Sequence, residues 1–290
     1  MITRRTGALL VLAAGVMFSF GALFFRSTDE VDAWQYLAFR GAGAVAVVGP
    51  LLLWRNRSDL GAVRRRLRWQ HVAAGAVLGS LFISFILALS QADAAFVLLL
   101  QALAPIVAAL LSWLILRERL ERDAAVASAA ALIGVAVMVS SGLDAGIGWG
   151  VVAAAYIPLG LGAYSTLVRA GSDGDPLVPV VIGGVITMVA GVVVSLGRGG
   201  LGVSGRDLLI GLLAGALLIG LPTPLFNLAQ RAVPAPDATL LLMSEIVLGP
   251  LWPWLVYEET PSGATLTGGV IIFVAVVGLT VRSRGSKVAA

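Results

Sequence analysis

The stretch "GALLVLAAGVMFSFGALFFR", from Gly7 to Arg26, is long and apolar enough to cross a lipid bilayer as one helix. An α-helix rises 1.5 Å per residue, so about 20 apolar residues span a hydrocarbon core of roughly 30 Å. Arg4 and Arg5 precede it, as in a signal peptide, but no small-residue cleavage site follows, so we expect a retained first helix. Of the 290 residues, 59% are hydrophobic and 12% are charged, with a mean hydropathy of +0.96. This composition predicts an all-α integral membrane protein.

Apolar runs separated by charged residues or by glycine and proline divide the chain into ten predicted spans. These are 7–26, 34–54, 71–90, 93–115, 124–141, 148–169, 177–196, 208–230, 237–257 and 264–282. Of the 20 Lys and Arg residues, all but four fall in connections on one side; Arg26, Arg198 and Arg206 lie on the other, and Arg40 lies inside a span. The positive-inside rule makes the crowded side cytoplasmic. We therefore expect a multi-pass protein of the bacterial cytoplasmic (inner) membrane, with both termini in the cytoplasm.

The two halves of the chain resemble each other. "GVVAAAYIPLGLGAYSTLVR", from Gly150, aligns with the first stretch and places Arg169 over Arg26. "DAAFVLLLQALAP", from Asp93, aligns in the same way with "DATLLLMSEIVLG", from Asp237. Because each half holds an odd number of spans, the second must enter the membrane from the opposite side. The pattern predicts a five-helix repeat in residues 1–145 and a second, inverted repeat in 146–290, arranged around a central cavity.

Five segments carry a resemblance to a known family. They are "FSFGALFFR", "LGAYSTLVR", "LAFRGAGA", "PIVAALLSWLILRERL" and "SEIVLGPLWPWLVYEETP". In this order they resemble the drug/metabolite transporter superfamily, in its ten-helix EamA-type branch. The resemblance implies cytoplasmic termini, a central cavity between the halves and export of small metabolites such as amino acids. One departure is Arg117 before Glu118, where the fourth helix of the family usually ends in Gly-Glu.

Glu245 is a carboxylate in the middle of an apolar span. It follows Asp237 by eight residues, which is roughly 12 Å along a helix. An ionised side chain at that depth costs about 2.5–3.5 kcal/mol on insertion scales, so it should face the bundle interior. We expect either a cation or coupling site, or a structural carboxyl group bonded to backbone freed near Pro250. Gln101 holds the equivalent position in the first half, so the two side chains either share a substrate site near the pseudo-two-fold axis or simply bond each other.

Prolines are expected to kink or interrupt several spans, because a proline lacks the amide donor and clashes with the preceding turn. In "IGLPTPLFN", Thr223 and the carbonyls near Leu218 to Gly220 are left to face water or substrate. The candidate hinges are Pro105, Pro158, Pro222, Pro224 and Pro250.

Arg40 allows two interpretations: it snorkels outward toward the acidic outer loop of Asp29, Glu30 and Asp32, which we favour slightly, or it projects inward and binds a carboxylate. Aromatic side chains deep in the spans could form cavity walls, although simple packing explains each one equally well. The candidate substrate-binding residues are Glu245, Gln101, Trp252, Tyr156, Tyr164, Phe18, Arg40 and Asn227.

Three functional classes are open to a protein of this kind: an intramembrane enzyme, a channel or scaffold, and a carrier. One histidine and no cysteine make an intramembrane enzyme or a metal site a poor explanation. A channel or scaffold gives no reason for the pairing of Gln101 with Glu245. We therefore expect a carrier without a cofactor that exports small amphipathic metabolites, such as neutral or aromatic amino acids, by alternating access. A proton-coupled multidrug exporter is the alternative. The expected partners of the protein are a small-molecule substrate and the lipid bilayer, with no nucleic acid, and we expect a monomer.

Overall fold

The computed structural model describes residues 3–59, 61, 65, 67–116, 129–130, 133–134, 136–137, 148–264 and 266–274. Within these ranges the chain is helical and contains no strand. Eight helical segments are long and apolar enough to cross a membrane. They are Arg4–Arg26, Ala33–Arg55, Trp69–Leu89, Ala94–Leu111, Trp149–Ala170, Val178–Gly197, Gly205–Ala229 and Asp237–Tyr257. The predicted spans 124–141 and 264–282 lie largely or partly outside the described residues.

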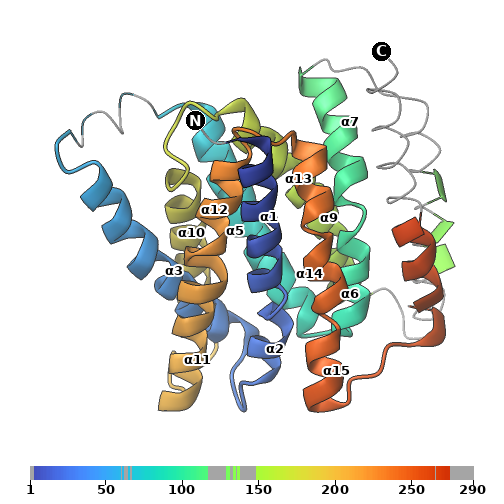
Figure 1. Cartoon of the computed structure of the whole chain (residues 1–290). Helices are drawn as coiled ribbons and strands as arrows, with labels where there is room; N and C mark the ends of the chain where they lie inside the picture. Colours follow the sequence, from blue (N-terminus) through green and yellow to red (C-terminus); the bar gives the residue numbers. More distant parts are fainter. Residues whose placement is uncertain are drawn as a thin grey trace.

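Four of these segments are interrupted, and the helices stand side by side as one bundle (Figure 1). In the first half the helices are α1 (Arg4–Phe18), α2 (Gly21–Arg26), α3 (Ala33–Arg55), α5 (Trp69–Leu89), α6 (Ala94–Gln101) and α7 (Ala104–Leu116). In the second half they are α9 (Trp149–Ala170), α10 (Val178–Gly197), α11 (Gly205–Gly215), the π-helix η2 (Ala216–Gly220), α12 (Pro222–Ala229), α13 (Ala235–Leu241), α14 (Met243–Leu248) and α15 (Leu251–Tyr257).

Proline accounts for some of the interruptions but not for all of them. Pro222 begins α12 directly after the π-helical turn, and Pro250 lies between α14 and α15. Pro105 is the second residue of α7, which begins three residues after α6 ends. By contrast, α9 runs through Pro158 without a break, so of the expected kink or interruption the structure shows no interruption there. The first span is interrupted without any proline, at Ser19 and Phe20.

Glycines allow the helices to approach closely. α3 packs against α10 and α11, and α5 packs against α9 and α10. A Cβ atom at Gly215 of α11 would overlap the backbone carbonyl of Arg40 in α3, and one at Gly75 of α5 would overlap Ile182 of α10. Such small residues are what helices need in order to pack in lipid, where no hydrophobic force drives them together. The contact at Gly215 places the backbone of Arg40 against the second half of the chain.

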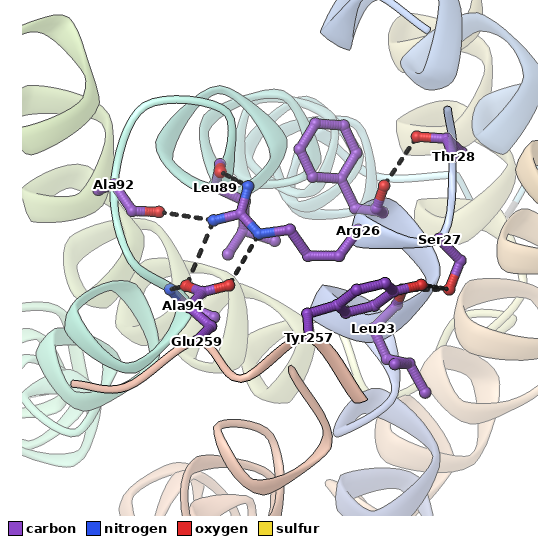
Figure 2. A network of polar contacts seen from close by, with 10 residues as sticks. Leu23, Arg26, Ser27, Thr28, Leu89, Ala92, Ala94, Tyr257 and Glu259 are labelled. Carbon is purple, nitrogen blue, oxygen red and sulfur yellow. Dashed lines mark hydrogen bonds and ion pairs between the residues drawn. The ribbon is translucent and has the colours of Figure 1, made fainter. Parts of the chain in front are cut away.

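An arginine at the end of each half's first span secures the connection between the third and fourth spans of its own half. Arg26 donates to the carbonyls of Leu89 and Ala92, at 2.8 and 3.1 Å (Figure 2). Arg169, its counterpart in the sequence repeat, donates to the carbonyls of Gln230 and Val233, at 3.4 and 3.3 Å. The two halves therefore use equivalent arginines for equivalent contacts.

These two contacts lie at opposite ends of the bundle. Arg4, at the start of α1, pairs with Asp237 of α13 at 2.7 Å, at the end where α9 finishes with Arg169. At the other end, Arg26 also pairs with Glu259 at 2.9 Å, and Glu259 accepts the amide N–H of Ala94 at 2.6 Å (Figure 2). Figure 1 places α1 and α13 together at the N-terminal end of the bundle, and α2 and α15 together at the opposite end.

Candidate functional site

A cavity bounded by helices of both halves lies in the bundle interior. Its volume is about 80 Å³, and most of its lining is apolar. The polar lining residues are Arg40, Gln101, Tyr164, Thr223 and Glu245. Of the eight predicted substrate-binding residues, five line it: Phe18, Arg40, Gln101, Tyr164 and Glu245. A small apolar cavity with a few placed polar groups is the usual form of a small-molecule site.

Gln101 and Glu245 contact each other in this cavity. The Gln101 side-chain amide donates a hydrogen bond to Glu245 Oε2 at 2.9 Å, and both residues are buried. Gln101 is the last residue of α6, and Glu245 lies in the short helix α14, so both are next to a helix interruption. The equivalent positions of the two halves therefore meet in space.

Arg40 does not turn outward to the acidic loop, so the favoured prediction of a snorkelling side chain is wrong. The residue is only 5% exposed, and its guanidinium lies 5.4 and 5.8 Å from the ring centres of Phe82 and Phe85. The outer carboxylates have other partners, since Asp29 pairs with Arg206 and Asp32 with Arg198. The close packing of α3 against α11 directs Arg40 into the bundle.

Arg40 and Glu245 put opposite charges on the lining of one cavity. They interact electrostatically but form no direct ion pair. Nε and Nη1 of Arg40 are buried and have no hydrogen-bond partner among the described residues. Buried charged groups normally have their hydrogen bonds satisfied, so the free donors of Arg40 fit a site for an anionic ligand group.

Tyr164 connects the cavity to the end of the bundle where α9 finishes. Its hydroxyl donates to Asn227 Oδ1 at 2.6 Å, and Asn227 Nδ2 donates to the carbonyl of Pro176 at 2.8 Å. Pro176 belongs to the connection between α9 and α10. Asn227, one of the predicted substrate-binding residues, therefore lies one hydrogen bond away from the cavity and not on its lining.

Trp252 and Tyr156, also predicted to contact substrate, lie elsewhere. Trp252 stacks on Phe20 with ring centres 4.8 Å apart and donates to Ser19 Oγ at 3.1 Å, at the break in the first span. The Tyr156 hydroxyl is 2.6 Å from Ser80 Oγ, and its ring lines a larger outer cavity of about 920 Å³ at the end of the bundle near Arg26.

Sequence reasoning missed several wall residues of the central cavity. Phe82 and Phe85 of α5 and Phe226 of α12 line it. Nothing in the sequence distinguishes Phe82 and Phe85 from packing residues, because the third span is apolar on all sides and has no clear face. The sequence did single out Thr223, because it lies between two prolines, and this residue lines the cavity as well. Among the described residues, no group of three or more His, Cys, Asp or Glu side chains could hold a metal ion.

A family model of EamA-like transporters matches the chain twice, over residues 5–140 and 148–281. The chain belongs to the EamA-like transporter family. Its two-repeat organisation is thereby shown, and it is a membrane transporter and not an enzyme. One protein of known crystal structure has the same fold as this EamA-like chain, with a TM-score of 0.70, 22% sequence identity and coverage of 97% of this chain and 99% of that one. No curated protein matches the sequence significantly.

Proposed function

We propose that this EamA-like transporter exports small amphipathic metabolites, specifically neutral or aromatic amino acids, by alternating access through the central cavity. The observation that carries the proposal is the placement of Arg40 and Glu245 on one otherwise mostly apolar cavity. An amino acid presents one cationic group, one anionic group and an apolar side chain. A cavity with one cation, one carboxylate and aromatic walls matches these three features.

We further infer that the two repeats are inverted in the membrane. The matched contacts of Arg26 and Arg169 at opposite ends of the bundle support this arrangement. The end that carries Arg4 and Arg169 would face the cytoplasm, in a bacterial inner membrane, because most arginines gather in the connections on that side. Inverted repeats place a substrate site near the membrane centre, between the two halves, where Gln101 meets Glu245.

The polar groups suggest how a substrate is held. Glu245, fixed by Gln101, would accept an ammonium group, and Arg40 would donate to a carboxylate. Phe18, Phe82 and Phe85 would contact the apolar side chain. Sugar phosphates fit poorly, because at least two negative charges would face Glu245 with only Arg40 to compensate them.

A proton-coupled multidrug exporter is the second candidate. A deep carboxylate such as Glu245 suits an organic cation or a coupling proton. The nearby charge of Arg40 counts against cationic drugs, since it would repel a ligand that carries no anionic group.

Counterflow in proteoliposomes tests the proposal. Vesicles preloaded with unlabelled phenylalanine should accumulate labelled phenylalanine, leucine or methionine, and empty vesicles should not. Exchange of a sugar phosphate or of cationic dyes, with no exchange of these amino acids, would contradict the assignment.

A further inference from the structure

The hydroxyl group of Thr223 differs from those of other buried threonines in its hydrogen bonding. Three other buried threonines, Thr166, Thr187 and Thr239, each donate to the carbonyl four residues earlier in their own helix, at 2.8 to 3.1 Å. Thr223 is 2% exposed, and its Oγ1 has no hydrogen-bond partner among the described residues. A buried hydroxyl without a partner costs free energy, so its presence on a cavity wall calls for a ligand.

The local helix geometry explains why this hydroxyl is free. The carbonyl four residues before Thr223 belongs to Ile219, which lies in the π-helical turn Ala216–Gly220. A π turn is wider than an α turn, and Pro222 and Pro224 interrupt the usual hydrogen bonds on either side. The wider turn takes the Ile219 carbonyl out of the register that the other threonines use. The Thr223 side chain is left on the cavity lining.

Arg40 supplies unpartnered donors to the same cavity. Its Nε and Nη1 atoms are buried and unpaired among the described residues, and the rings of Phe82 and Phe85 lie close to the guanidinium. The element that precedes Thr223, η2, packs directly against α3, which carries Arg40. A guanidinium with two unpartnered nitrogen donors, together with a free hydroxyl on the lining of the same cavity, is a donor set suited to a carboxylate.

We propose that Arg40 and Thr223 form an anion subsite that binds the carboxylate of the substrate, while Glu245 and Gln101 bind its ammonium group. This inference rests on the proposed transport of amino acids and adds a specificity rule to it. Both charged groups of the amino acid are needed for binding, because a missing carboxylate leaves the donors of Arg40 and Thr223 unpaired and a missing ammonium group leaves the charge of Glu245 uncompensated. Thr223 is the residue that separates amino acids from the matching amines.

A competition experiment on the unaltered protein tests the rule first. Exchange of labelled phenylalanine is measured in proteoliposomes with unlabelled phenylalanine, phenylalaninamide, phenethylamine or 3-phenylpropionate as competitor. We expect only phenylalanine to compete well, with the other three at least roughly tenfold weaker, because each lacks a charged group that a buried donor or acceptor requires. Equal competition by phenylalaninamide would overturn the anion subsite without any mutation.

Substitutions then test Thr223 itself. Thr223→Val keeps the shape and removes the hydroxyl, so the KM for phenylalanine should rise roughly tenfold, while the weak inhibition by phenethylamine, which has no group to accept from this hydroxyl, stays unchanged. Thr223→Ser keeps the hydroxyl and should behave like the wild type. Thr187→Val is the matched control, since it removes a buried hydroxyl that donates to the Gly183 carbonyl of its own helix at 2.8 Å, with the Gly79 carbonyl of α5 at 3.5 Å, and does not line the cavity.

The outcomes separate the two proposals. If the wild-type protein exchanges no amino acid, the proposed function fails. If it exchanges phenylalanine and Thr223→Val retains the wild-type KM, the proposed function stands and the role of Thr223 is wrong. An equal loss in Thr187→Val, or an equal rise of the phenethylamine inhibition constant in Thr223→Val, would reduce Thr223 to a structural residue.

Discussion

Gln101 Nε2 donates to Glu245 Oε2 at 2.9 Å, joining the equivalent positions of the two halves inside the membrane region. The bond leaves Glu245 as an acceptor on a cavity that also contains Arg40. A structural role alone would need only the bond between the two side chains, whereas a transport role would need the negative charge as well.

Glu245→Gln is expected to reduce amino-acid exchange at least roughly tenfold, because the amide keeps the hydrogen-bonding shape but cannot balance an ammonium charge. Thermal unfolding in detergent should remain near the wild-type temperature. Glu30→Gln, at an exposed outer carboxylate, is the control and should transport normally. Full exchange by Glu245→Gln would leave Glu245 with a structural role only.

The proposed orientation can be measured directly, because the chain contains no cysteine. A single cysteine at Gly202, where a side chain meets open space, should react with a membrane-impermeant thiol reagent added outside intact cells. A cysteine at the exposed Ser58 should react only after the membrane is permeabilised. Labelling of Gly202→Cys from the cytoplasmic side alone would contradict the orientation of the second half.

Tyr164→Phe should destabilise the protein by about 1–3 kcal/mol, because it leaves the buried Asn227 Oδ1 without its donor. The measurement is thermal or denaturant unfolding in detergent. Tyr156→Phe is the matched control on the same helix, since its hydroxyl contacts the part-buried Ser80. We expect a smaller loss of stability in Tyr156→Phe. Equal losses in the two variants would mean that the hydrogen bond to Asn227 stabilises the protein no more than the contact with Ser80 does.

Asp93 gives a pH-dependent prediction at the end of the bundle that carries Arg26. Burial raises the pKa of Asp93, the charge of Glu259 raises it further, and Arg26 partly opposes both. The folded protein therefore binds the Asp93 proton more tightly than the unfolded chain does. Stability from this group is lost as the pH rises from the ordinary carboxyl range through the raised pKa.

Asp93→Asn removes that ionisation and keeps a residue suited to the start of α6. The variant should melt at a higher temperature than the wild type at neutral pH. The difference should shrink when both are measured at a more acidic pH, because protonation of Asp93 removes the wild-type charge that costs stability in the folded protein. A gain that is the same at both pH values would show that ionisation of Asp93 is not its cause.

Span composition, the segregation of arginines and the correspondence between the halves all follow from the sequence, because hydropathy and charge act locally along the chain. The repeat alignment predicted that Gln101 and Glu245 would approach each other, since equivalent positions in two related halves lie at equivalent depths. The same reasoning could not orient Arg40: its span begins near an acidic loop, and both directions were open to it.

The direction of Arg40 depends on the close contact between Gly215 and the α3 backbone, which brings two distant segments together. The roles of Phe82 and Phe85 depend on helix rotation, and an apolar helix without a distinct face leaves that rotation to its neighbours. The positions of the prolines alone did not predict that α9 would be continuous while the eighth span would be interrupted. The free hydroxyl of Thr223 follows a π turn that packs against α3, and the sequence alone did not predict this turn.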